Sequence, residues 1–176
     1  MRLSNRNKAS VYNFINTLLV LIFIGGIGVF LFEKFKYDFL GWESYFLLII
    51  PVFLLVLFYK MGRQIFEYDS DGEALNFKNR NIIPFLDTTA SDEFPKYKLM
   101  KFEVVNIPFI KRLYITISSK KGSPTILKYD ISYLTKKETN DLKFSLNKVV
   151  KNNKEKREDD NNNDTWQTNS SKKKIV

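Results

Sequence analysis

Two long apolar runs stand near the start of the chain, and the hydrophobic pattern changes after them. Residues 14–32 form a run of 19 residues without a charged side chain. As an α-helix this run would be about 28 Å long, close to the thickness of the hydrocarbon core of a bilayer. Residues 42–60 form a second run that carries no charge between Glu43 and Lys60. The pattern predicts two transmembrane helices joined by a linker over residues 33–41, with residues 1–13 as an N-terminal tail.

Each run has an alternative explanation. The first could be a signal peptide, since Arg2, Arg6 and Lys8 precede it. It is longer than a usual signal core, however, and residues 33–36 provide no small-residue cleavage site. The second could be a buried core helix, but it is apolar on every face and lacks a polar stripe to meet water. We therefore expect an antiparallel transmembrane hairpin.

Three glycines lie close together in the first predicted helix, at Gly25, Gly26 and Gly28. Small residues allow the backbones of membrane helices to approach closely. We expect this surface to pack against the second helix or against a second protomer of a homodimer. The alternative is that the glycines are only tolerated there.

Basic residues flank the apolar region on its two outer sides. Residues 1–10 carry three basic residues and no acid, whereas residues 33–43 offset Lys34 and Lys36 with three acids. Residues 60–176 carry 23 Lys and Arg against 16 Asp and Glu. The positive-inside rule then predicts that both termini are cytoplasmic and that the linker lies outside. Abundant lysine, asparagine, isoleucine and phenylalanine are typical of an AT-rich bacterial genome, so we expect the cytoplasmic (inner) membrane of a bacterium.

Beyond Gly62 the hydrophobic period changes to two, which is typical of β-strands. In the predicted strand over 98–107, Met100, Phe102 and Val104 share one face. Residues 82–86 are a candidate short strand, 87–95 are expected to form a polar loop, and 120–124 a turn. The other predicted strands are 65–69, 74–79, 112–119 and 125–131, with a hairpin turn containing Asp71-Gly72 between the first two.

A capped helix should follow the strands. Thr135 and Glu138 have the spacing of a capping box, in which each side chain satisfies a free backbone N–H at the helix start. An apolar stripe at helical spacing comprises Leu142, Leu146, Val149 and Val150. We expect the helix to end near residues 151–153 and the polar residues 153–176 to be disordered.

The order of these elements, and above all the stretch 112–150 (strand, KKGSP turn, strand, capped helix), resembles a known arrangement. It resembles bacterial membrane proteins that carry a pleckstrin-homology-like (PH-like) domain after a two-helix anchor. The resemblance covers residues 14–152. It implies an α+β membrane protein in which residues 62–152 form a small antiparallel β-barrel or sandwich of two nearly orthogonal sheets, capped by the C-terminal amphipathic helix. The layout is also similar to that of the photosystem I assembly protein family, which implies that it can serve the assembly of membrane complexes.

Several kinds of chemistry are excluded by composition, because the chain has no cysteine and no histidine. Zinc sites of the Cys/His type, thiol nucleophiles and histidine acid–base catalysis all need these residues. The acidic turn containing Asp69, Asp71 and Glu73 lacks the longer ligand series of a calcium loop. We expect no metal, no cofactor and no catalytic residue. An enzyme would have to use carboxylates such as Glu67, Asp69 or Asp87.

Seven basic residues from three segments are candidates for one rim of the small sheet. Facing the bilayer, such a rim would attract anionic headgroups, each contact contributing roughly 1 kcal/mol. Ordinary solvating charges are the alternative, and nucleic acid is not expected, because aromatic residues are not clustered among these charges. The seven residues are Lys96, Lys98, Lys101, Lys111, Arg112, Lys120 and Lys121.

Together these features predict a non-enzymatic, membrane-anchored binding or scaffold module. Its expected partners are the lipid bilayer, anionic headgroups, and another membrane protein or a second copy of the chain. Two alternatives remain open. The chain could be a small subunit or assembly factor of a membrane complex, with the glycine-bearing helix as the contact, or an enzyme acting on a membrane-embedded substrate.

Overall fold

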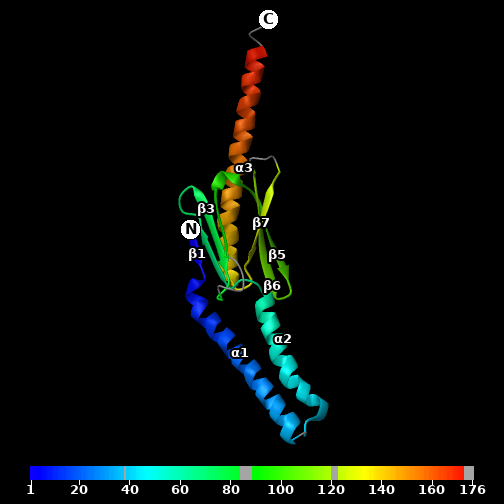
Figure 1. The fold of residues 1–176 in the computed structure, drawn as a ribbon. Helices are drawn as coiled ribbons and strands as arrows, with labels where there is room; N and C mark the ends of the chain where they lie inside the picture. Colours follow the sequence, from blue (N-terminus) through cyan, green and yellow to red (C-terminus); the bar gives the residue numbers. More distant parts are fainter. Residues whose placement is uncertain (38, 84–88, 120–122, 173–176) are drawn as a thin grey trace.

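The computed structural model describes residues 1–37, 39–83, 89–119 and 123–172, with side chains in the last helix as far as Asp159. Figure 1 shows an elongated α+β molecule with two apolar helices at one end and two antiparallel sheets in the middle. A long C-terminal helix lies against the sheets and projects beyond them at the end opposite the helix pair.

The two apolar helices are present as predicted and run antiparallel. Helix α1 spans Ala9–Phe32 and α2 spans Phe46–Lys60, joined by a π-helical turn, η2 (Glu33–Tyr37), and a 3-10 turn, η3 (Gly41–Tyr45). With their flanking turns, two helical stretches are long and apolar enough to cross a membrane, namely Arg6–Tyr37 and Gly41–Lys60. The described part of the chain leaves most of their apolar side chains uncovered.

Seven strands in the described residues form the two sheets. The first sheet has the order β1-β2-β3-β4, and the second has the order β5-β6-β7. Every neighbouring pair is antiparallel. The strands are β1 (Arg2–Ser4), β2 (Ile65–Asp69), β3 (Ala74–Arg80), β4 (Ala90–Pro95), β5 (Leu99–Ile107), β6 (Ile110–Ile117) and β7 (Thr125–Asp130).

Strand β1 corrects the prediction that residues 1–13 form a tail. Leu3 pairs with Tyr68 on β2, and its side chain is buried in the core of the sheets. A strand of three residues is too short to show a period, and its partner lies more than sixty positions along the chain. The hairpin of α1 and α2 is therefore inserted between two adjacent strands of one sheet.

The core lies between the sheets and the first half of α3 (Lys136–Lys172). Aromatic rings fill its centre, with Phe77 stacked on Tyr129 at 4.9 Å between ring centroids. Leu142 and Leu146 of α3 are fully buried against these rings, and Val149 and Val150 pack at the margin. The predicted apolar stripe of the helix is thus confirmed, and so are the strands over 65–69, 74–79, 112–119 and 125–131, whose ends agree within two residues.

Two predictions about the strands were wrong. Residues 90–95, expected as a polar loop, form β4, because backbone pairing with β3 holds a polar edge strand in which Phe94 is the buried residue. Met100 does not share a face with Phe102 and Val104. A β-bulge between Leu99 and Lys101 shifts the register, so that Leu99 is buried and Met100 is exposed.

Helix α3 also extends beyond the predicted end at 151–153 and runs to Lys172, so the disorder expected for 153–176 does not hold for residues 153–172. No glycine or proline interrupts residues 136–172. Ion pairs one turn apart, Lys151–Glu155 and Lys154–Glu158, add support to its exposed part. Of the candidate strand 82–86, Ile82 and Ile83 form a bend. The remainder of that strand and most of the 120–124 turn lie outside the described residues.

Candidate functional site

The two helices enter the domain at one end, which we call the helix-side end. It comprises the start of α1, the end of α2, the β5–β6 turn and the β7–α3 connection over residues 131–135. Main-chain groups at the end of a helix lack partners within the helix, so they have to be satisfied by neighbouring groups. The contacts made there decide how firmly the domain is held to the helix pair.

The β7–α3 connection is bonded directly to both helices. The Tyr133 hydroxyl donates to the Phe58 carbonyl oxygen at 2.8 Å, and the Ser132 hydroxyl donates to that of Met61 at 2.7 Å. From α1, the Tyr12 hydroxyl donates to the Tyr133 carbonyl oxygen at 3.2 Å, and the two rings meet edge to face at 5.0 Å. Burial raises the pKa of Tyr133 to about 12, so its hydroxyl stays protonated, and able to donate, well above neutral pH. These contacts tie the last turn of α2 and the first turn of α1 to the same connection.

Gly62 allows the chain to turn from α2 into the sheet. Its φ is +91°, and a Cβ there would lie 2.5 Å from the Asp130 carboxyl carbon. Glycine just past a helix end commonly adopts this conformation. Asp130 accepts the backbone N–H of Arg63 at 3.4 Å and the Nε of Arg112 at 3.3 Å. A side chain at position 62 would displace this carboxylate from both of its donors.

An ion pair joins the start of α1 to the start of α3. Lys8 Nζ lies 2.8 Å from Glu138 Oε1, and the predicted capping box between Glu138 and Thr135 is formed. Burial opposes ionisation of Glu138, but the bonds from Lys8 and Thr135 outweigh it and lower the pKa of this carboxyl. The capping residue of α3 thus also fixes the N-terminal segment.

Asn5 joins the N-terminal segment to β2 and is fully buried. Its Nδ2 donates to the Gln64 carbonyl oxygen, and its Oδ1 accepts the Phe66 N–H, both at 2.8 Å. One side chain therefore satisfies two backbone groups, one just before β2 and one within it.

The five predicted basic residues that the structure describes do not lie at one end of the sheet. In the β5–β6 hairpin, Leu99 pairs with Ile117 at one end and Ile107 with Ile110 at the other, so these ends are about 25 Å apart. Lys111 and Arg112 lie at the helix-side end, where Lys111 N–H donates to Ser132 Oγ at 3.0 Å.

Three other residues of the predicted basic set lie away from this end. Lys96 and Lys98 lie at the far end, where the Lys96 carbonyl oxygen accepts Asn153 Nδ2 at 2.6 Å. Lys101 is exposed on β5 near that far end and pairs with Glu103 at 3.7 Å. Lys120 and Lys121 lie outside the described residues.

Other residues, not selected from the sequence, make up the helix-side surface. The β5–β6 turn presents Ile107 and Phe109, which are 46% and 70% exposed. Phe109 has a φ of +67°, a conformation that a bulky residue adopts at a cost of roughly 1–2 kcal/mol. The sequence signal that could have identified this part of the surface is the apolar run Ile-Pro-Phe-Ile at 107–110. Exposed basic residues at the same end are Arg6, Lys60, Lys136 and Lys137.

The three glycines of α1 separate into two groups. A Cβ on Gly26 would lie 2.5 Å from the Leu47 carbonyl oxygen, so Gly26 is where α1 and α2 pack backbone to backbone. A Cβ on Gly25 or Gly28 would meet nothing within 4 Å. Nearer the domain, the Tyr59 hydroxyl donates to Asn16 Oδ1 at 2.6 Å and bridges the two helices.

The carboxylates proposed for an enzyme do not form a paired site. Asp69 lies at the end of β2 away from the helices and is bonded to Arg2 at 2.8 Å. The Asp71 N–H and then Arg2 lower the pKa of Asp69, so it is a stabilised anion. Glu67 lies two residues earlier on the strand, and Asp87 lies outside the described residues. In the described part of the chain, no three acidic side chains come together to hold a metal ion.

Comparison with protein family models, with curated proteins and with solved structures finds no match to this chain, so its function is argued from its own residues.

Proposed function

We propose that this chain is a non-enzymatic binding or scaffold protein that holds a PH-like domain rigidly at the cytoplasmic face of a bacterial inner membrane. The observation that carries the proposal is the insertion of the apolar helix pair between β1 and β2 of one sheet. A domain interrupted in this way cannot move away from its anchor on a flexible linker.

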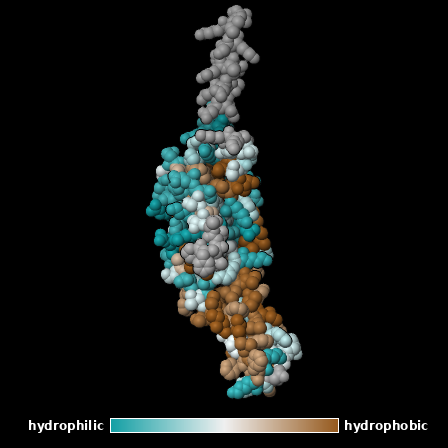
Figure 2. All heavy atoms as spheres, in the orientation of Figure 1, coloured by the Kyte–Doolittle hydropathy of each residue, from teal (hydrophilic) through white to brown (hydrophobic). Residues whose placement is uncertain are grey.

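The distribution of apolar surface supports a membrane location for the helix pair. Figure 2 shows hydrophobic residues gathered over the two helices, between a mainly polar domain and a more polar tip at the opposite end. Within this band Phe14, Leu21 and Phe53 are 67%, 60% and 62% exposed. Helix α1 alone, at about 1.5 Å per residue, is about 36 Å long, which is enough to cross the hydrocarbon core.

Strand pairing supports the placement of both ends of the helix hairpin on the same side of the membrane. Because β1 precedes α1 and β2 follows α2, the pairing of Leu3 with Tyr68 requires both ends of the hairpin on one side of the membrane. The basic residues that flank the hairpin favour the cytoplasm as this side. The turns η2 and η3 then lie on the opposite side.

The arrangement of the sheets supports the PH-like assignment. Four strands and three strands, each in sequential order, enclose a core that the first half of the C-terminal helix closes. In this domain the first strand precedes the membrane hairpin and the other six follow it.

The helix-side surface is the face that would meet the headgroups. Tyr133 and Ser132 hold it against the end of α2, Phe109 is exposed on it, and Lys111 and Lys60 lie at the same end of the domain. A partly inserted aromatic ring with flanking lysines is a combination suited to an anionic interface. This set replaces the rim expected from the sequence.

The orientation can be tested by thiol labelling, since the chain has no cysteine of its own. Glu43→Cys, in η3, and Ser118→Cys, at the far end of the domain, place exposed thiols on opposite sides. A membrane-impermeant maleimide should label position 43 in cells whose outer envelope has been opened, and position 118 only after the inner membrane is permeabilised. Labelling of both positions from the same side would refute the topology, and the cysteine-free chain is the control.

The binding role can be tested by photo-crosslinking in intact membranes. A photoreactive residue at Phe109 or at Ile126, both exposed, samples the helix-side surface and the outer face of β7. The proposal expects a lipid adduct at position 109 or a protein adduct at either position. Absence of any adduct at both positions, in a chain that inserts correctly, would refute the binding role.

A second candidate function, a small subunit or assembly factor of a membrane complex, is favoured by the bare surface at Gly25 and Gly28. Another helix could approach α1 closely there. Replacing both glycines with leucine should abolish co-purification of a membrane partner or of a second copy, while the hairpin, packed at Gly26, stays intact. Unchanged co-purification would remove this candidate.

A further inference from the structure

We propose that Glu33, at the tip of the helix hairpin, binds the primary ammonium group of an aminophospholipid headgroup in the leaflet opposite the domain. This inference rests on the proposed membrane hairpin, and it adds a second lipid contact at the other end of the molecule. It concerns a cationic headgroup nitrogen, whereas the helix-side surface of the domain attracts anionic groups.

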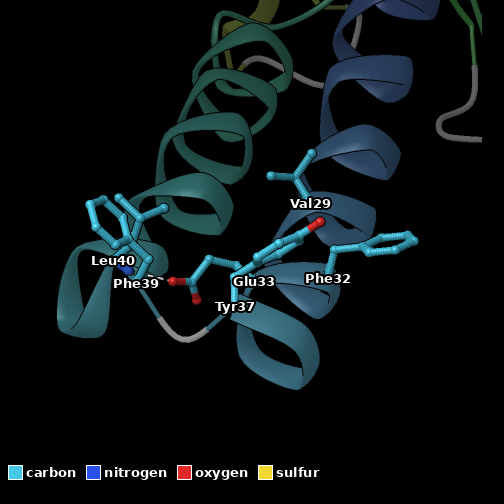
Figure 3. Close-up of a pocket in the computed structure, with 6 residues that line it drawn as sticks. All are labelled: Val29, Phe32, Glu33, Tyr37, Phe39 and Leu40. Atoms are coloured by element: carbon cyan, nitrogen blue, oxygen red, sulfur yellow. Dashed lines mark hydrogen bonds between the residues drawn. The ribbon is translucent and has the colours of Figure 1, made fainter.

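The carboxylate of Glu33 is buried and only half satisfied. The side chain is 5% exposed and reaches from η2 toward the start of η3, where Oε1 accepts the N–H of Leu40 (Figure 3). In the described part of the chain, Oε2 has no hydrogen-bond partner. A buried carboxylate oxygen without a donor is costly, and a cation that donates a hydrogen bond relieves this cost.

A hollow beside this carboxylate offers room for a ligand. It measures about 550 Å³, within the usual range for small-ligand sites. Figure 3 shows its lining side chains at the junction of α1, η2 and η3. They are Val29, Phe32, Glu33, Tyr37, Phe39 and Leu40. Apart from the Glu33 carboxylate and the Tyr37 hydroxyl, the walls are apolar side chains, which suit a glycerol backbone and the first methylenes of acyl chains.

The position of the hollow favours a lipid over an amine from solution. It lies where the apolar band of α1 ends, and two of its walls, Phe32 and Phe39, are 66% and 89% exposed. In a bilayer these rings would lie at the level where acyl chains meet headgroups. Lys36, exposed in the same turn as Glu33, can pair with the phosphate of a zwitterionic lipid.

The chemistry also selects the type of ammonium. A primary ammonium carries three N–H donors, one of which can satisfy Oε2. A trimethylammonium group, as in phosphatidylcholine, has no N–H and cannot donate to it. An anionic lipid without a nitrogen offers Glu33 only repulsion. The expected order of binding is phosphatidylethanolamine, then phosphatidylcholine, then phosphatidylglycerol.

Lipid titration of the full chain in detergent, read by native mass spectrometry, tests this order. We expect phosphatidylethanolamine to bind about tenfold more tightly than phosphatidylcholine, as one charge-assisted hydrogen bond would give. Glu33→Gln should remove the preference, and Glu43→Gln, an exposed acid at the same end, should keep it. Equal binding of the two lipids, or a preference that survives Glu33→Gln, would overturn the proposal.

Two further arms separate the ways in which the proposal could fail. A series of N-methylated ethanolamine lipids on the unchanged chain should show a stepwise loss of binding, a result that needs no variant to fold. Free phosphoethanolamine that displaces the lipid at millimolar concentration would assign the site to a soluble amine and overturn the lipid source. Flotation with vesicles of phosphatidylcholine alone tests the hairpin itself. A chain that floats without headgroup preference refutes this site, whereas a chain that fails to float refutes the membrane anchor.

Discussion

Gly26→Ala is the substitution that best isolates the packing of the two apolar helices. A Cβ at this position would lie 2.5 Å from the Leu47 carbonyl oxygen and 3.5 Å from Cγ of Pro51. Carbon–oxygen contacts between helices are ordinarily about 3.3 Å or longer, so the backbones would have to separate by nearly 1 Å. The Leu47 oxygen belongs to the main chain and cannot rotate away as a flexible side chain could.

The expected magnitude follows from a comparison with the neighbouring glycines. Forcing an extra carbon into a close-packed contact costs about 1–3 kcal/mol, whereas alanine is favoured over glycine within a helix by about 1 kcal/mol. At Gly25 and Gly28 the added carbon meets nothing within 4 Å, so only the helix preference for alanine over glycine affects stability. Gly26→Ala should therefore be about 1–3 kcal/mol less stable than Gly25→Ala or Gly28→Ala.

Thermal unfolding of the three variants in a mild detergent measures this difference. A chain of this length shifts its melting temperature by about 2–4 °C per kcal/mol. We expect Gly26→Ala to melt about 2–12 °C below the other two variants, which should melt at or above the unchanged chain. Equal melting temperatures for all three alanine variants would refute the backbone-to-backbone packing at Gly26.

Three other predictions follow from the domain and its junction with the helices. Asn5→Ala leaves the Phe66 N–H without its acceptor and should cost about 1–3 kcal/mol in chemical unfolding, whereas the exposed control Asn7→Ala should change stability by less than about 0.5 kcal/mol. Burial raises the pKa of Tyr133 to about 12, above the value of about 10 in the unfolded chain. The stabilisation from the protonated hydroxyl is therefore complete below about pH 10 and is lost between about pH 10 and 12. An unfolding free energy that stays constant across this pH range would contradict the prediction. Phe109 is exposed and has a left-handed backbone conformation, which asparagine adopts more readily than phenylalanine. Phe109→Asn should therefore raise the melting temperature of the chain in detergent, where no bilayer contacts the ring. An unchanged or lower melting temperature would count against strain at this turn.

Local patterns predicted the elements whose signals lie within a few residues of sequence. The uncharged run at 14–32 predicts a long apolar helix, because the length and composition of the run are local properties of the chain. The box formed by Thr135 and Glu138, and the turn containing Gly72, likewise depend on neighbouring backbone groups. These features are present in the structure as predicted.

Contacts between distant segments could not be predicted in this way. Strand β1 is set by pairing with β2, and the polar strand β4 is set by pairing with β3. The sequence predicts that basic residues from three segments converge at one rim, but β5 and β6 run antiparallel, so Lys98, just before β5, and Lys111, on β6, lie at opposite ends of the sheet. Sequence spacing does not report which end of a strand a residue occupies.

The sequence by itself determined that two apolar helices precede a domain of short strands and one capped helix, because hydrophobic period and end signals are local properties. Only the tertiary structure decided that the hairpin interrupts a sheet, that Gly26 and not Gly25 or Gly28 meets the second helix, and that Glu33 lies buried beside a hollow. Each of these depends on which surfaces meet in space, and the free energy of those contacts is shared between residues far apart in the chain.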